Sequence, residues 1–235
     1  MPWDGPACAQ CGVPFASARA LDAEPSLCGS CRSGEQSFDR ARSFGLYTDR
    51  LRQAILLMKF RRRDRLGKKL GGFLLPVWES VEELRTADDP VVLPVPLHAS
   101  RQRERGFNQA EVLARGLVRA LSSRTAGRGP RLETHCLRRT RPTPPQTGLS
   151  LRERRENVRG VFEVMRPQTL RGRVVVLVDD VMTTGATLSA CARAVREAAP
   201  ARIVALTLAR ATPQFPGQDV SDPFLPVDEA GPSWT

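Results

Sequence analysis

Val174-Val175-Val176-Leu177-Val178 runs directly into Asp179-Asp180-Val181-Met182-Thr183-Thr184-Gly185-Ala186-Thr187. An unbroken β-branched and apolar run is typical of a strand that is buried on both faces of a parallel sheet. The residues after the loop, 187–198, have the composition of a helix. The strand therefore delivers two carboxylates and a threonine-rich turn to the carboxyl edge of the sheet, where α/β proteins bind their ligands.

The loop that follows this strand has the chemistry of an anion cradle. Gly185 allows the backbone to turn tightly, and the next helix offers N–H groups and a positive dipole end to a phosphate. Asp179 and Asp180 can accept hydrogen bonds from ribose hydroxyls and help to hold hydrated Mg²⁺. A helix-capping turn or a Walker B acid pair would share these fragments, but the chain contains neither G-x-x-x-x-G-K-[ST] nor G-x-G-x-x-G.

Strand and helix patterns alternate along most of the chain. Strands are expected at 38–47, 91–97, 132–137, 161–164 and 203–208, and helices around 51–58, 70–84, 108–121 and 187–198. This alternation predicts a parallel α/β sheet with right-handed crossovers. The Arg-rich segment 138–159 is expected to form a long mobile loop. The segment 213–235 has four acids and no Lys or Arg, which predicts a disordered tail.

Four of the six cysteines form two C-x-x-C pairs, Cys8/Cys11 and Cys28/Cys31, with sixteen residues between the pairs. Two such knuckles make the closed, four-thiolate site of structural zinc. A redox dithiol and an iron–sulfur cluster are the alternatives. A bound metal would supply most of the stability of so small a module.

The net charge of +11 on 235 residues favours acidic partners such as phosphates or nucleic acid. The chain has 33 Arg and only 3 Lys, however, so a general coding bias toward arginine explains the same excess.

No apolar run reaches the ~18 residues that span a bilayer. The first residues lack the basic and apolar stretches of a signal peptide. We therefore expect a cytoplasmic protein without membrane insertion.

These pieces, in this order, resemble the ComF family, whose members are linked to DNA uptake in natural transformation. The resemblance covers about residues 8–210. Besides the cysteine pairs and the loop, it includes Met58-Lys59-Phe60, Val95-Pro96-Leu97-His98, Arg105-Gly106-Phe107-Asn108-Gln109, Leu137-Arg138-Arg139 and Asn157-Val158-x-Gly160.

The resemblance implies a type I phosphoribosyltransferase fold, a Rossmann-like α/β parallel sheet with a small N-terminal zinc ribbon that has four cysteine ligands. The expected divisions are a ribbon over 1–37, a helical, hood-like linking segment over 38–90 and a phosphoribosyltransferase-like domain over 91–212. The tail at 213–235 follows.

The string from Asp179 to Thr187 resembles the 5-phosphoribosyl-1-pyrophosphate (PRPP) motif of type I phosphoribosyltransferases. The resemblance implies PRPP or ribose 5-phosphate as ligand, with Mg²⁺. The PRPP-binding residues would be Asp179, Asp180, Val181, Met182, Thr183, Thr184, Gly185, Ala186 and Thr187. Catalysis would depend on Asp179, Asp180 and Arg105, and the pyrophosphate would be bound by Arg101, Arg103 and Arg105.

Three functional hypotheses are compatible with these features. The first is an enzyme that transfers a phosphoribosyl group to or from an unidentified acceptor, and the second is a nucleotide-salvage phosphoribosyltransferase, which no base-recognition signature supports. The third is a non-catalytic, PRPP-responsive module that binds single-stranded DNA and contacts DNA-uptake proteins. Its DNA-binding residues would be Lys59, Arg61, Arg62, Arg63, Arg65, Lys68 and Lys69. The aromatic content of 6% counts against binding that depends on base stacking.

Overall fold

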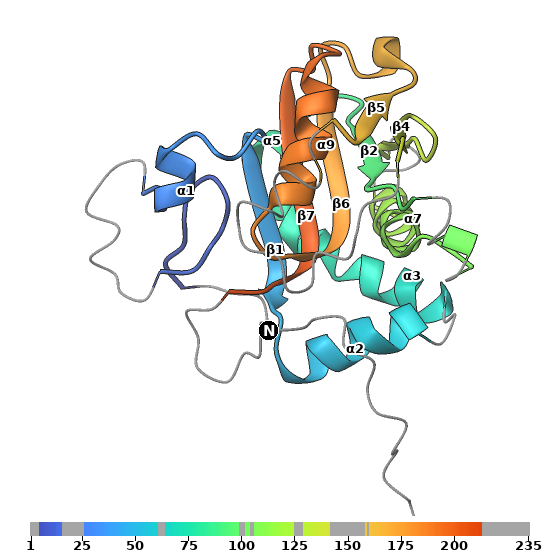
Figure 1. Ribbon diagram of the computed structural model, residues 1–235. Coiled ribbons are helices and arrows are strands. Elements are labelled where there is room, and N and C mark those ends of the chain that lie inside the picture. Colours follow the sequence, from blue (N-terminus) through green and yellow to red (C-terminus); the bar gives the residue numbers. More distant parts are fainter. Residues whose placement is uncertain are drawn as a thin grey trace, which may run out of the picture.

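The computed structural model has a five-stranded sheet at its centre (Figure 1), with strand order β1-β7-β6-β2-β3. The structure describes residues 5–15, 26–60, 64–98, 102–103, 106–124, 129–141, 158 and 160–212. The strands are β1 (Arg40–Leu46), β2 (Val91–Pro94), β3 (Arg131–Leu132), β6 (Val174–Met182) and β7 (Arg202–Arg210). All four neighbouring pairs are parallel, as the strand–helix alternation predicts.

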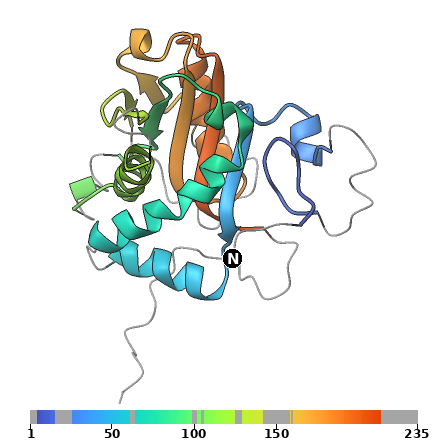
Figure 2. The same cartoon turned by 180° about the vertical axis from the view of Figure 1, so that it is seen from behind.

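Helices cover both faces of this sheet, with α9 on one face and α3 and α7 on the other (Figures 1 and 2). The helices are α1 (Gly29–Arg32), α2 (Asp49–Phe60), α3 (Asp64–Gly72), α4 (Leu74–Glu79), α5 (Glu82–Arg85), α7 (Gln109–Ser122), α9 (Ala186–Arg196) and the short 3-10 helix η2 (Pro167–Thr169). A separate antiparallel hairpin joins β4 (Leu137–Arg139) to β5 (Phe162–Val164).

The side chains of β6 alternate between two hydrophobic cores. Val175 and Leu177 pack with α9, the hairpin and the cysteine-bearing N-terminal segment. Val176 and Val178 pack with α2, α3, α4 and α7 on the opposite face. Because neighbouring side chains of a strand point to opposite faces, a strand with a core on each side must be apolar at every position. The continuous apolar run therefore predicts this strand correctly.

The strand β6 extends further than its apolar run, because β7 continues to pair with it through Met182 opposite Arg210. Its other neighbour, β2, ends at Pro94 opposite Val178. One more hydrogen bond follows, from Val95 N to Val178 O at 2.9 Å. The last four residues of β6 thus have a strand on one side only, and the two aspartates lie in this half-open stretch.

Several predicted elements differ in extent. The expected strand over 132–137 is divided between β3 and β4, which belong to different sheets. The expected helix over 70–84 is three short helices, and the first residues of the expected loop 138–159 belong to β4. Since β1 pairs with β7, the sheet takes strands from both sides of the expected boundary at residue 91.

Within the described ranges, no helix has the length and apolar composition to cross a membrane. The segment 213–235 lies outside the described residues.

Helices α3 and α7 cross with their backbones in contact at two glycines. A Cβ added to Gly71 would lie 2.3 Å from Leu113 O, and one added to Gly116 would lie 2.3 Å from Lys68 O. Either distance is far below van der Waals contact, so a side chain at the crossing must separate the helices. The crossing holds α3 against α7, which packs on the sheet. Because α3 also contacts α2, the crossing helps to fix the position of α2.

Gly71→Ala should therefore lower the free energy of unfolding by about 1–3 kcal/mol, the usual cost of overpacking a core. Gly72→Ala is the matched control, because a Cβ at Gly72 meets nothing within 4 Å. That control should be neutral, or stabilising by up to ~1 kcal/mol through helix propensity. Urea denaturation of both variants measures the difference. Equal stabilities would contradict the close crossing.

Candidate functional site

The two aspartates of β6 form a paired acidic site together with a buried lysine. Asp180 N donates a hydrogen bond of 2.9 Å to Asp179 Oδ1. Lys59 Nζ, at the last turn of α2, lies 3.0 Å from Asp180 Oδ2, and the Lys59 side chain is only 1% exposed. Burial raises the pKa of Asp179 to about 7, and the Asp180 carboxylate adds to this shift, whereas Lys59 and Arg139 oppose it.

This position of Lys59 corrects its assignment to an exposed DNA-binding stretch. The whole residue is 3% exposed and its ammonium group is directed at the acid pair. The sequence carries a signal for this burial, because Lys59 lies four residues after Ile55, on the apolar side of α2. Lys59 is therefore a residue of the acidic site.

Arg139 is a second cation near the acid pair. It lies on β4 opposite Phe162 of β5, and its guanidinium carbon is 5.6 Å from the centre of the Phe162 ring. Its charge lowers the pKa of Asp179, in opposition to the larger effect of burial. The hairpin thus contributes positive charge to the site from a segment where the sequence predicts mostly loop.

The loop after β6 turns sharply at Gly185, which has a φ of +80° and precedes the first residue of α9. A Cβ at this position would lie 2.7 Å from Gln36 Oε1 and 2.8 Å from Met182 Cε, so the turn has room only for glycine. Thr184 Oγ1 accepts a hydrogen bond of 3.2 Å from Ala186 N. The acid pair is thereby followed at once by the N-terminus of a helix of eleven residues, a position that favours anions.

The arginine segment predicted to bind pyrophosphate connects the end of β2 to α7. Arg103 is exposed, while Arg101 and Arg105 lie outside the described residues. The segment is anchored after these arginines by Asn108, whose Oδ1 accepts from Ala110 N at 3.1 Å and whose Nδ2 donates to Val95 O at 3.0 Å. Asn108 therefore caps α7 and ties it to β2. The segment begins at the same sheet edge as the acid pair.

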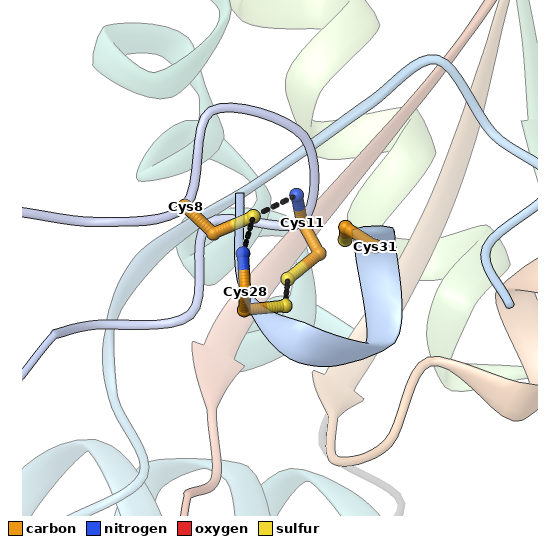
Figure 3. A group of neighbouring side chains, drawn as sticks. All are labelled: Cys8, Cys11, Cys28 and Cys31. Atoms are coloured by element: carbon orange, nitrogen blue, oxygen red, sulfur yellow. Dashed lines mark hydrogen bonds between the residues drawn. The ribbon is translucent and has the colours of Figure 1, made fainter. Parts of the chain in front are cut away.

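The four N-terminal cysteines converge beside β1, two from a loop and two from the start of helix α1 (Figure 3). All four sulfur atoms lie within 4.8 Å of one another. Cys8 Sγ accepts hydrogen bonds from the backbone nitrogens of Cys11, at 3.5 Å, and Cys28, at 3.3 Å. A tetrahedral metal with four sulfur ligands at ~2.3 Å requires sulfur atoms about this close. The cluster could therefore hold one metal ion such as zinc.

The charge around the cluster also fits a metal bound by thiolates. A hydrogen bond from Cys11 lowers the pKa of the Cys8 thiol well below its usual range, whereas hydrogen bonding with Cys11 raises the pKa of Cys31. Four thiolates this close together would repel one another unless a cation lay between them. Cys136 and Cys191, in contrast, are fully buried in the core, and burial raises the pKa of each thiol.

Two arginines from the sheet lie against the cysteine cluster. Arg210 of β7 is 6% exposed and donates from Nη1 to Cys11 O at 3.3 Å, with Nη2 4.0 Å from Cys11 Sγ. Arg42 of β1 donates to Ala9 O at 2.9 Å. Burial lowers the pKa of both guanidinium groups, and the nearby cysteines oppose this. Their two positive charges match the 2− charge of a divalent ion with four thiolates.

The remaining residues of the proposed DNA-binding stretch divide into two groups. Arg65, Lys68 and Lys69 are exposed on α3. Arg61, Arg62 and Arg63 lie outside the described residues. One turn beyond Lys69, Phe73 is 46% exposed and stacks on Phe44, with ring centres 5.0 Å apart.

The chain is similar in sequence to known proteins and to one domain family. The phosphoribosyl transferase domain family matches residues 106–220. The chain is 32% identical to competence protein F of Haemophilus influenzae over 208 residues, which are 88% of this chain and 85% of that protein. It is 31% identical to DNA utilization protein YhgH of Escherichia coli K12 over 189 residues, which are 79% of this chain and 76% of that protein.

Among solved structures, the allosteric regulatory enzyme of purine biosynthesis is similar to this chain with a TM-score of 0.37 and 23% identity, over 60% of this chain and 25% of that one. The extent of the match to competence protein F decides the family. The chain therefore belongs to the ComF family, and its α/β sheet is that of a phosphoribosyltransferase domain.

Proposed function

We propose that this protein binds PRPP with Mg²⁺ and transfers the phosphoribosyl group, in the service of DNA uptake. The observation that carries the proposal is the acid pair in the half-open end of β6, followed directly by the N-terminus of α9. Ribose hydroxyls and a 5-phosphate are the ligand groups that such a sequence of acceptors and donors would bind. The printed names of the relatives, a competence protein and a DNA utilization protein, support the biological role.

Each part of the site has a role in this chemistry. Asp179 and Asp180 would accept hydrogen bonds from the ribose hydroxyls and orient the ring. The turn at Gly185 and the start of α9 would bind the 5-phosphate. When the bond from C1 to pyrophosphate breaks, positive charge develops on the ring, as in glycoside chemistry, and the arginines of 101–105 would stabilise the leaving group. Bound Mg²⁺ would supply additional neutralisation of the pyrophosphate charge.

The acid pair accepts hydrogen bonds most strongly when both carboxyl groups are ionised, because protonation turns one acceptor oxygen into a donor. Burial and the Asp180 charge raise the pKa of Asp179 to about 7, so close to neutral pH a substantial fraction of Asp179 is protonated. Lys59 and Arg139 oppose this rise. Binding that requires ionised Asp179 should therefore weaken as the pH falls through about 7.

Asp179→Asn with Asp180→Asn should weaken the binding of PRPP or ribose 5-phosphate by roughly 100-fold, since hydrogen bonds to charged groups contribute ~1.5–3 kcal/mol each. Isothermal titration calorimetry measures the loss. The matched control replaces the other adjacent pair, Asp88→Asn with Asp89→Asn, which precedes β2 at the opposite edge of the sheet. If both double variants bind as tightly as the parent, the site assignment is wrong.

In the parent protein the dissociation constant should rise about tenfold between about pH 8 and about pH 6, as expected for one essential group with a pKa near 7. Asp179→Asn alone should remove the part of this pH dependence that comes from Asp179. The dissociation constant should then change with pH only through the titration of the ligand phosphate. A parent and a variant with the same pH dependence would show that Asp179 does not titrate in the site.

We also propose that the cysteine cluster holds one structural zinc ion, with Cys8, Cys11, Cys28 and Cys31 as ligands. The four sulfur atoms are mutually close, the buried Arg210 and the partly buried Arg42 balance their charge, and Cys11 and Cys28 have sulfur atoms 3.6 Å apart. No open coordination position remains once four thiolates bind, which is the structural rather than the catalytic arrangement.

Protein purified without added metal should contain about one zinc per chain, as four thiolates close a single site. Cys28→Ser with Cys31→Ser should lose the metal, whereas Cys136→Ala with Cys191→Ala should keep it because those thiols lie elsewhere in the core. Elemental analysis by mass spectrometry separates zinc from iron. Zinc retained by the Cys28/Cys31 variant, or iron in its place, would overturn the assignment.

A second candidate function, binding of single-stranded DNA, is supported by the exposed face of α3. Arg65, Lys69 and Phe73 follow one another at four-residue intervals, which places them on one side of the helix and its C-terminal end. All three are exposed. Two cations beside an exposed phenylalanine that stacks on a second, partly buried one are the features that contact a phosphate backbone and an unpaired base.

Arg65→Glu with Lys69→Glu should weaken the binding of a single-stranded oligonucleotide by at least about tenfold at low salt, because each lost phosphate contact reduces counterion release. PRPP binding should persist. Arg171→Glu with Arg202→Glu is the control: it makes the same change of net charge on exposed residues away from α3. Fluorescence anisotropy of a labelled oligonucleotide measures both affinities. If the two variants bind the oligonucleotide equally well, the α3 face is not the DNA site.

A further inference from the structure

Gln36 connects the segment that carries the four cysteines, here called the cysteine ribbon, to the turn Thr183-Thr184-Gly185 between β6 and α9, here called the phosphate loop. Its Nε2 donates a hydrogen bond of 3.1 Å to Thr184 O, and its Oε1 accepts one of 2.7 Å from Ser189 Oγ. The next backbone nitrogen, Ser37 N, donates to the same Ser189 hydroxyl at 3.3 Å. Thr184 lies in the loop and Ser189, 3% exposed, lies in the first turns of α9. One glutamine therefore holds both sides of the turn at Gly185.

The contact with Thr184 determines how the turn faces a ligand. In a trans peptide the C=O and the following N–H point in opposite directions. Because Gln36 holds the Thr184 carbonyl, the Gly185 N–H must point away from Gln36. Gly185 is also in close contact with this side chain, since a Cβ there would lie 2.7 Å from Gln36 Oε1. The orientation of this peptide thus depends on a residue 148 positions before Thr184 in the chain.

The position of Gln36 is itself fixed by the second cysteine knuckle and by the sheet. On one side, Gly34 N donates to Cys31 O at 3.1 Å and Glu35 N donates to Ser30 O at 3.0 Å. On the other, Asp39 accepts a 2.6 Å hydrogen bond from Ile203 N at the start of β7. The short segment between these anchors carries Gln36 to the loop, so the fold of the knuckle is transmitted to the turn.

We propose that Gln36 is a positioning residue of the phosphoribosyl site, through which the cysteine ribbon orients the Thr184–Gly185 peptide toward the 5-phosphate. This inference rests on the proposed binding of PRPP. Gln36 acts through the peptide and the helix that it holds. It extends the site to the N-terminal segment, where the sequence shows only a metal-binding module.

The decisive comparison is between Gln36→Met and Gln10→Met. Methionine preserves the length of the side chain and removes its hydrogen bonds. Gln10 is the matched control, because it too joins the ribbon to the rest of the protein, through a 2.8 Å hydrogen bond from Nε2 to Phe38 O, but does not contact the phosphate loop. Both variants should retain the full metal content of the parent.

Gln36→Met should raise the dissociation constant for ribose 5-phosphate roughly fivefold to tenfold, as expected for lost hydrogen-bond support. Hydrogen exchange of the amides over 184–189 should accelerate in the same variant without ligand. Gln10→Met should change neither quantity. Equal affinity and equal exchange in Gln36→Met and the parent would overturn the proposal.

Gln36→Glu separates positioning at a phosphate site from a general structural role. The carboxylate can still accept from Ser189, but it cannot donate to Thr184 O and it places a negative charge beside the turn. Ribose 5-phosphate should bind more weakly to this variant than to Gln36→Met, and added salt should reduce the difference by screening. A structural role alone predicts the reverse order, because the glutamate retains one of the hydrogen bonds.

The dissociation constant for ribose 5-phosphate and the hydrogen exchange of residues 184–189 together separate this inference from the proposed function. If the parent protein binds neither PRPP nor ribose 5-phosphate, the proposed function fails, but exchange over 184–189 still decides whether Gln36 positions the loop. If the parent binds and Gln36→Met binds equally well with unchanged exchange, only the role of Gln36 is overturned.

Discussion

Two adjacent carboxylates at the end of a strand buried on both faces require compensating positive charge, and much of the structure provides it. Asp179 and Asp180 follow directly from the core of β6, where burial already raises the pKa of Asp179 to about 7. Lys59 reaches the pair from α2 and Arg139 from the β4–β5 hairpin. The N-terminus of α9 adds its dipole. The acid pair thereby explains why elements distant in sequence converge on this edge of the sheet.

The cysteine cluster also gathers negative ligand groups whose charge is balanced by cations from other parts of the fold. Four thiolates and one divalent ion would leave a charge of 2−, and Arg42 and Arg210 supply two guanidinium groups from β1 and β7. In both places a locally encoded group of negative ligands is completed by cations from the sheet or from a helix packed on it. Some of the many arginines of the chain therefore have a structural role, and coding bias alone does not explain the excess of arginine.

The sequence predicts what is local and misses what depends on packing. The strand, its acids, the turn and the following helix are contiguous, and their pattern is sufficient to find them. The cysteine spacing is equally local. Lys59, Arg139 and Gln36 could not be assigned in the same way, because each reaches the site through tertiary contacts. For Lys59 the spacing from Ile55 holds a clue, but the surrounding basic run indicates a solvated surface. The expected strand at 132–137 failed because its two apolar ends join different sheets.

The cysteine-bearing segment is joined to the end of β6 and the loop after it through the backbone of the sheet as well as through Gln36. Arg210, which contacts Cys11, is the register partner of Met182, at the end of the strand that carries the acids. Ala211 N then donates to Met182 O at 2.9 Å. The end of β7 thus contacts the cysteine cluster through the Arg210 side chain, and the residue after it, Ala211, bonds to the last residue of β6 through its backbone. A cysteine-bearing segment attached only by a linker would have no need of a buried arginine at this point, so the cysteine cluster and the acid pair belong to one continuously packed structure.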